Sequence, residues 1–227
     1  MWPPEQERFD DRADAGRALG AAVAAHLGMI DGPVTPLVLA LPRGGVPVGV
    51  EVARATGGDL DLVLVRRVGL PWLADVGVGA IAEDGVPVFD HAALATYGLH
   101  IGDMAPAVAR ERAEMSRWQQ NYRDDRPAPD VAGRIVVIVD DGLSTGITAR
   151  AAVRAIRGGN PSYLAFAAPV CAAESVDWLA EEADAVIDLY SPREFHALGL
   201  YYRHFPAVTD AEVRAMCATA WQTAPVG

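Results

Sequence analysis

Short runs of β-branched and other apolar residues recur along this chain, and glycine, proline or charged residues bound each run. Apolar runs without alternation are typical of strands buried on both faces of a sheet. We expect such strands at residues 36–41, 59–65, 136–139, 162–170 and 185–190. Segments with helical spacing separate them, at residues 10–27, 48–55, 149–156 and 174–183. This alternation predicts an α/β fold, a parallel sheet flanked by helices on both faces.

Three segments do not fit this alternation. Residues 68–79 are punctuated by glycine, and residues 80–89 have the pattern of a hairpin around a turn at 83–85. Residues 103–122 have the pattern of a long helix, which we expect to pack on the core or to mediate a homodimer. We therefore expect one domain over residues 1–227, with a core at about 34–190 and small hood, hairpin or lid elements at about 68–90 and 191–210.

The end of the predicted strand at 136–139 carries the strongest candidate site. Asp140 and Asp141 follow the strand directly, and a loop from Gly142 to Thr148, rich in glycine and hydroxyl groups, leads into a helix. The first N–H groups of a helix are free to bind an anion, and the helix dipole favours negative charge there. The carboxylates suit sugar hydroxyls or a metal ion instead. Together these features predict a site for a ribose 5-phosphate.

Two further strand ends carry basic residues. The first predicted strand runs into Arg43, Gly44 and Gly45, where the glycines let a ligand approach the backbone and the guanidinium can hold two phosphate oxygens. The next strand ends at Arg66 and Arg67, and alternation sends these side chains to opposite sides. The carboxyl ends of parallel strands meet at one edge of a sheet, so the loops can converge on one ligand. The alternatives are a plain turn and a solvated pair of arginines.

The order of residue types from Val136 to Thr148 resembles the phosphoribosyl-diphosphate (PRPP) binding signature of type I phosphoribosyltransferases: a hydrophobic strand, two acids, a small loop and Thr-Gly-x-Thr. The Arg-Gly-Gly loop and the basic pair stand in the family's order, so the resemblance covers about residues 34–190. The opening Phe-x-Asp-Arg-type helix and the phrase Gly-Ala-Ile-Ala-Glu-Asp-Gly also resemble a poorly characterised branch of predicted phosphoribosyltransferases.

This resemblance implies that Asp140 and Asp141 address the ribose hydroxyls, directly or through Mg²⁺, and that the loop after them wraps the 5-phosphate. It implies a diphosphate loop with a non-proline cis peptide near Arg43, a mobile lid at 68–79 and a variable hood that recognises the acceptor. Family enzymes that salvage 6-oxopurines have an aspartate at the position of Ser144, so such an acceptor is disfavoured. The implied PRPP-binding residues are Arg43, Gly44, Gly45, Arg66, Arg67, Asp140, Asp141, Gly142, Leu143, Ser144, Thr145, Gly146, Ile147 and Thr148.

Composition narrows the classes of function. The net charge of -11 disfavours nucleic-acid binding, because the protein as a whole repels a phosphate backbone. All 19 basic side chains are arginine, which excludes Schiff-base lysine chemistry and the lysine of a nucleotide P-loop. No stretch of about 18 uncharged apolar residues predicts a membrane span, and the first residues do not resemble a signal peptide. Cys171 and Cys217 have no metal or redox spacing, which indicates reduced thiols of a cytoplasmic protein.

These observations favour a Mg²⁺-dependent phosphoribosyltransferase, in which a small nucleophilic acceptor displaces diphosphate from PRPP. Asp140 and Asp141 would hold the ribose and the metal. Glu83 or Asp84 would accept the proton of the acceptor, unless both are turn residues. The acidic surface favours an amine over an anionic acceptor, with a nucleobase also open. The expected catalytic residues are Asp140, Asp141, Arg67 and Glu83.

Two other classes of function stay open. A regulatory PRPP-sensing protein would have the same fold without catalysis, but regulators of this kind usually carry a basic face or an added helix-turn-helix, and neither is evident in the sequence. A PRPP synthase-like diphosphotransferase or a nucleotide hydrolase ranks last, because no ATP site is recognisable. The aromatic tail at 195–205 either lines the acceptor pocket or packs on the core.

Overall fold

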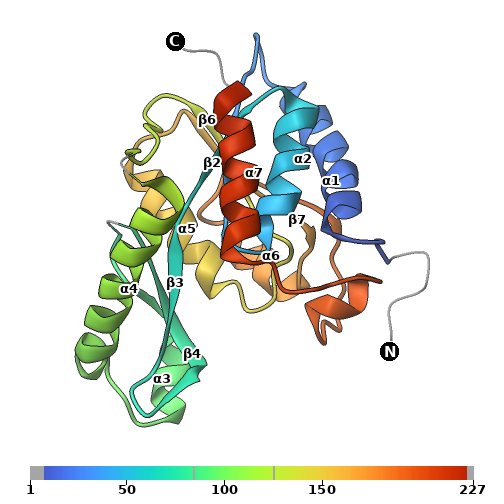
Figure 1. Ribbon diagram of the computed structural model, residues 1–227. Helices are drawn as coiled ribbons and strands as arrows, with labels where there is room; N and C mark the ends of the chain where they lie inside the picture. The colour runs from blue at the N-terminus through green and yellow to red at the C-terminus, as the bar shows by residue number, and fades with distance from the viewer. Residues whose placement is uncertain (1–7, 84, 125, 224–227) are drawn as a thin grey trace.

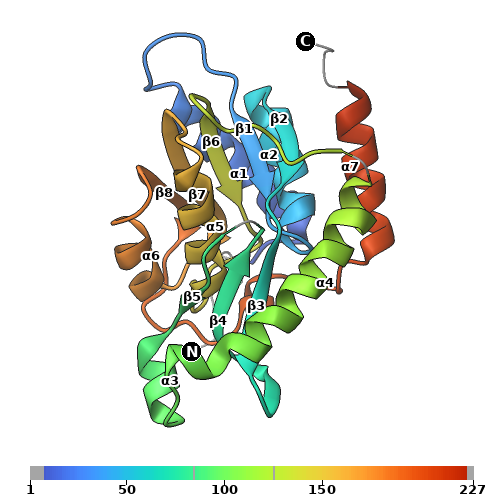
Figure 2. The same ribbon diagram turned by 90° about the vertical axis from the view of Figure 1, so that its left-hand side faces the viewer.

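The computed structural model describes residues 8–83, 85–124 and 126–223. A five-stranded parallel sheet in the order β2-β1-β6-β7-β8 forms its centre (Figures 1 and 2). The α/β fold expected from the sequence is confirmed. The strands are β1 (Leu37–Ala40), β2 (Asp59–Leu62), β6 (Ile135–Val139), β7 (Tyr163–Val170) and β8 (Ala185–Tyr190).

Helices cover both faces of this sheet, because successive strand residues are apolar on both sides. In β6, Val136 and Ile138 pack in the cluster that contains α5 and α6, whereas Val137 and Val139 pack in the cluster that contains α1, α2 and α7. The strand alternation therefore builds two separate cores from one apolar run. The helices are α1 (Arg12–Leu27), α2 (Gly45–Thr56), α5 (Ile147–Gly158), α6 (Ala173–Leu179) and α7 (Asp210–Thr223).

The first helix ends at Leu27 as expected and begins at Arg12, two residues after the expected start. Asp11 is its N-cap and accepts a hydrogen bond from the Asp14 N–H at 2.8 Å, while Gly28 follows its last turn. Two glycines inside the helix have a packing reason. A Cβ atom on Gly16 would lie 2.9 Å from Glu51, and one on Gly20 would lie 2.8 Å from Ala55. These glycines therefore let α1 approach α2 closely.

A second, antiparallel sheet extends away from the first, as Figure 2 shows. It contains β3 (Val65–Leu70), β4 (Leu73–Ala82) and β5 (Val88–Phe89), so the expected hairpin at 80–89 is confirmed. One of its faces packs against α3 (His91–Thr96), the 3₁₀ turn at Ile101–Met104 and α4 (Ala105–Arg123). The long helix expected at 103–122 is thus present, while a homodimer through it stays a prediction.

Two expectations about this region were wrong. The parallel strand expected at 59–65 ends at Leu62, so Arg66 and Arg67 lie inside β3 rather than at the end of a core strand. Residues 68–79 are not a loop but the arms of the β3–β4 hairpin, whose turn exposes Trp72. The physical reason is a local core: Val68, Val78 and their neighbours are buried against α3 and α4. Tertiary packing overrides the glycine punctuation.

Within the described residues, every helix is too short or too polar to cross a membrane. Cys171 and Cys217 are both free and buried.

Candidate active site at the carboxyl ends of the strands

The loops after β1 and β6 touch each other, because these two strands are neighbours in the sheet. A Cβ atom on Gly45 would lie 2.6 Å from the Val139 carbonyl oxygen, and one on Gly44 would lie 2.0 Å from Asp141 Oδ2. Only glycine therefore permits this approach. The peptide bond between Pro42 and Arg43 is cis, as the family resemblance implies. The structure thus brings the Arg-Gly-Gly loop and the acidic pair together.

The loop from Gly142 to Gly146 is held by the end of β7 and by α6. The Leu143 N–H donates to the Val170 carbonyl at 2.8 Å, and the Ala172 N–H donates back to the Leu143 carbonyl at 2.7 Å. Gly146 has φ +69°, and a Cβ atom there would lie 2.1 Å from the Trp178 ring. This glycine is required both by its backbone conformation and by the ring above it.

The hydroxyl side chains of this loop stand at the start of α5. Ser144 and Thr145 are exposed, whereas the carbonyl of Ser144 accepts from the buried Ser175 hydroxyl. Helix α5 begins at Ile147, so the N–H groups of its first turn have no partner within the helix. The local geometry is therefore that of an anion site, with the backbone held in place by β7 and α6.

The two aspartates differ in their surroundings. Asp140 is partly exposed, and its Oδ1 accepts from the Asp141 N–H at 2.8 Å. Burial and the charge of Asp141 raise the pKa of Asp140 well above its usual value. Asp141 is buried, and its Oδ2 accepts a 2.7 Å hydrogen bond from Arg12 Nε. Asp140 thus keeps some exposure to solvent, whereas Asp141 is buried and paired with Arg12.

Arg12 was not expected at this site. A signal was present, because Arg12 occupies a position on the same helical stripe as Ala15, Leu19 and Val23, all of which are buried. An arginine on an apolar stripe needs a buried partner. That partner is Asp141, 129 residues away in the sequence. The helical pattern does not indicate which residue the partner is.

Arg43 reaches a different acid. Its Nη1 lies 3.5 Å from Asp210 Oδ1 at the start of α7, and both side chains are about half exposed. The Tyr122 hydroxyl donates to the same Asp210 oxygen at 2.6 Å. Burial and this acid raise the pKa of Tyr122. Asp210 therefore holds Arg43 at the rim while the guanidinium keeps access to solvent.

Arg66 and Arg67 point in opposite directions, as alternation predicts. Arg66 pairs with Glu111 at 2.8 Å and stacks over Trp118, so it belongs to the contact between β3 and α4. Arg67 is exposed and lies on the same face of β3 as Val65, which packs in the cluster of α5. Because α5 follows the anion loop, Arg67 is the arginine of the pair on the side of the site.

Glu83 is occupied elsewhere. Its Oε2 accepts from the buried Arg123 guanidinium and from Gln119 Nε2, and its Oε1 accepts from the Leu64 N–H at 3.2 Å. These bonds tie the two sheets together, so we do not assign Glu83 a role in proton transfer. Asp84, the alternative, lies outside the described residues.

The aromatic tail packs rather than standing over the sheet as an open hood. Tyr201 and Tyr202 are buried with Phe9, and the Tyr202 hydroxyl donates to the Asp141 carbonyl at 2.6 Å. Leu198 in the 3₁₀ turn Leu198–Tyr201 lies where a Cβ atom on Gly142 would be, at 2.1 Å. The tail thus contacts the acidic loop through Tyr202 and Leu198 and holds it in place.

A groove of about 670 Å³ lies between α2 and α7, at the amino end of β2. None of the loop residues discussed above line it. Its charged residues are already paired, Arg54 with Glu51 and Asp59 with Arg134. It is therefore separate from the anion loop.

Comparison with known proteins agrees with this geometry. The phosphoribosyl transferase domain family matches residues 16–189. Two curated proteins of Mycobacterium tuberculosis, from strains CDC 1551 and H37Rv, are provisionally named phosphoribosyl transferases; each is 39% identical over 207 residues. That alignment covers 91% of this chain and 46% of theirs, so the chain spans about half the length of these relatives.

Among solved structures, the crystal structure of TT1426 from Thermus thermophilus has a TM-score of 0.76 and 39% sequence identity. The match covers 93% of this chain and 98% of that one. The match to TT1426 shows that this fold is shared, and the family match runs from within α1 into β8, so it includes the loops after β1 and β6. The chain belongs to the phosphoribosyl transferase family.

Proposed function

We propose that this protein is a Mg²⁺-dependent phosphoribosyltransferase, which moves the 5-phosphoribosyl group from PRPP to a small nucleophilic acceptor and releases diphosphate. One observation carries the proposal: the Gly44–Gly45 backbone touches the acidic pair beside the anion loop of α5. In our proposal, one sugar phosphate therefore contacts the loop before α5, the acid Asp140 and the Gly44–Gly45 backbone.

The residues divide into groups by chemistry. In our proposal the exposed hydroxyls of Ser144 and Thr145 and the first N–H groups of α5 donate to the 5-phosphate. Asp140, which is partly exposed, accepts from the ribose hydroxyls. Arg43 and Arg67 hold the diphosphate and neutralise the charge that develops as it leaves. Arg66 is left out, because Glu111 already holds it.

The acidic pair fits Mg²⁺ in a limited way. No cluster of three metal-binding side chains exists within residues 8–83, 85–124 and 126–223. Mg²⁺ is commonly bound by one or two carboxylates together with substrate phosphates and water. Asp140 therefore suits a metal that arrives with PRPP. When bound, Mg²⁺ would neutralise part of the charge on the departing diphosphate.

Calorimetry with PRPP in the presence of MgCl₂ tests the donor. We expect saturable binding to the natural protein and a loss of about tenfold or more for Asp140→Asn, because a hydrogen bond to a charged group contributes about 1.5–3 kcal/mol. Asp59→Asn is the matched control, since Asp59 stands at the opposite end of the same sheet and pairs with Arg134. Absence of PRPP binding to the natural protein would refute the proposal.

Turnover needs a separate experiment. Isotope-labelled PRPP can be offered to a panel of amines and nucleobases, followed by mass spectrometry of the products. The net charge of -11 favours cationic amines, so ribosylation of anionic acceptors alone would contradict that part of the proposal. PRPP binding without any PRPP-dependent product in cell extract would favour the regulatory alternative.

A further inference from the structure

Arg12 is held on three sides at the carboxyl edge of the sheet. Its Nε donates to Asp141 Oδ2 at 2.7 Å, and its Nη1 donates to the Pro206 carbonyl at 2.6 Å. Its guanidinium carbon lies 3.7 Å from the centre of the Phe205 ring. The side chain is 10% exposed, so the cation is almost fully enclosed. Two segments that are distant from α1 in sequence, at Asp141 and at residues 205–206, therefore fix one charge beside the acidic pair.

This guanidinium is the counterion of the acidic pair. Among the ion pairs of the described residues, Arg12 is the basic partner of Asp141, and Asp140 has none. The Asp140 side chain bonds the Asp141 N–H, which keeps the two carboxylates adjacent. Without Arg12, neither carboxylate would have a basic partner among the described residues, and a hard divalent cation would be the charge that could replace it.

The same charge bears on the substrate. PRPP with one bound Mg²⁺ still carries net negative charge, because its 5-phosphate and diphosphate outweigh the metal. Two uncompensated carboxylates at the site would repel it, whereas an acidic pair half neutralised by Arg12 repels it less. An internal cation therefore weakens the attraction for bare metal and strengthens that for the metal–substrate complex.

We propose that Arg12 is a positioning residue and a built-in counterion, which keeps free Mg²⁺ off the acidic pair and admits the metal together with PRPP. The proposal rests on the proposed function. It predicts that loss of Arg12 moves two affinities in opposite directions. If Arg12 were purely structural, its loss would not raise the affinity of the protein for any ligand.

The test compares Arg12→Gln with the natural protein in two titrations. Mn²⁺ is titrated without PRPP and followed by electron paramagnetic resonance; we expect at least tenfold tighter binding in Arg12→Gln. PRPP is then titrated in MgCl₂ by calorimetry, and here we expect at least tenfold weaker binding. Arg12→Lys keeps the charge and should restore weak Mn²⁺ binding. Arg17→Gln is the control on the same helix, because Arg17 and its partner Asp14 are both exposed.

Each outcome decides the matter. Unchanged Mn²⁺ affinity in Arg12→Gln would overturn the proposal, whatever happens to PRPP. If the natural protein fails to bind PRPP, the proposed function is wrong. The Mn²⁺ titration still tests whether Arg12 keeps free metal off the acidic pair. If Arg12→Gln unfolds in metal-free buffer, MgCl₂ should restore its circular dichroism spectrum, since the metal replaces the lost cation. Failure to recover would also overturn it.

Discussion

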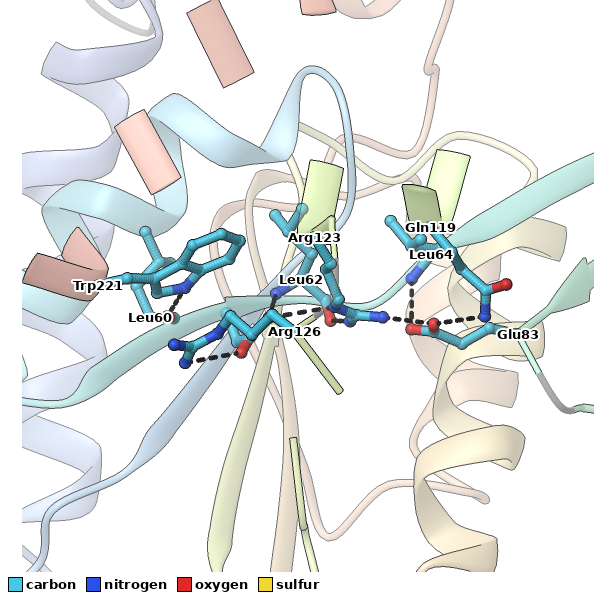
Figure 3. A network of polar contacts seen from close by, with 9 residues as sticks. Leu60, Leu62, Leu64, Glu83, Gln119, Arg123, Arg126 and Trp221 are labelled. Carbon is cyan, nitrogen blue, oxygen red and sulfur yellow. Dashed lines mark hydrogen bonds and ion pairs between the residues drawn. The ribbon is translucent and has the colours of Figure 1, made fainter. Parts of the chain in front are cut away.

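Two nearly buried arginines, Arg12 and Arg123, use the same chemistry in different parts of the molecule. Both extend from helices, and both pair with an aspartate that is distant in sequence. Arg123 at the end of α4 also binds Glu83 and the Leu62 carbonyl, so carboxylates and a carbonyl enclose it (Figure 3). Among the described residues, Arg12 pairs with one acid, Asp141, which follows a central strand.

The difference lies in what stands beside each pair. Asp61 is buried inside the edge strand β2; its burial raises its pKa, although the Leu62 N–H and Arg123 oppose that rise. Its network joins β2, α4 and the end of β4. Asp141 instead adjoins the partly exposed Asp140 and the Gly44 backbone. An arginine–aspartate pair therefore connects structural elements in one place and borders the candidate site in the other.

The largest expected effect is that of replacing Arg123, which connects β2, α4 and the end of β4. Arg123→Met should lower the free energy of unfolding by about 3–5 kcal/mol, because the nearly buried Glu83 loses the guanidinium that it pairs with and Asp61 is left with the half-exposed Arg126. Urea unfolding followed by circular dichroism measures it. Arg126→Met is the control, since Arg126 is half exposed at 3.5 Å from Asp61 and should cost at most about 1 kcal/mol. Equal losses in both variants would contradict a special role of Arg123.

The contact between the two loops should be next. Gly44→Ala places a Cβ atom 2.0 Å from Asp141 Oδ2, and overpacking of this kind costs about 1–3 kcal/mol. Because the displaced carboxylate belongs to the site, PRPP affinity should fall as well. Gly102→Ala has nothing within 4 Å of the new Cβ and should change stability by less than about 0.5 kcal/mol. Equal PRPP affinity in Gly44→Ala and the natural protein would separate Asp141 from the site.

Magnesium should distinguish the two arginines directly. At ten times its dissociation constant, a metal that binds only the folded protein adds about 1.4 kcal/mol of stability. We expect such a gain for Arg12→Gln but not for Arg123→Met, because the first variant frees a carboxylate whose sequence neighbour, Asp140, is a partly exposed acid, whereas the acids freed by the second are nearly buried. Thermal unfolding with and without MgCl₂ measures it. A similar gain in both variants would remove the distinction drawn here.

The smallest effect concerns the tail. Tyr202→Phe removes the hydroxyl that donates to the Asp141 carbonyl at 2.6 Å, which should cost about 1–1.5 kcal/mol. Tyr97→Phe, at an exposed ring, is the control and should be neutral. The measurement is urea unfolding, together with PRPP affinity. A larger loss of affinity than of stability would show that the tail acts on the site itself.

The parallel sheet and the loop at its carboxyl edge were predictable because their signals are local. A buried strand needs apolar residues on both faces, as in Val136–Val139, and an anion loop needs small residues before a helix. The cis peptide at Arg43 followed from the resemblance. Each of these features depends on neighbours in sequence.

The roles of individual charged residues depended on distant partners instead. Glu83 follows an apolar strand as a turn acid would, yet Arg123 of α4 takes its carboxylate. Arg66 and Arg67 are identical in type, and only the α4 face with Glu111 separates them. Glycine at residues 69 and 77 suggested a loop, but the core under Val68 and Val78 makes the segment a hairpin.

The sequence by itself determined the alternation of strands and helices in the parallel sheet, the position of the acidic loop and the family to which it points, because these follow from local periodicity and spacing. Only the tertiary structure decided which charges stay available to a ligand. The reason is that a buried charge needs a partner, and folding brings in that partner from anywhere in the chain. For Asp141 it is Arg12, and for Glu83 it is Arg123.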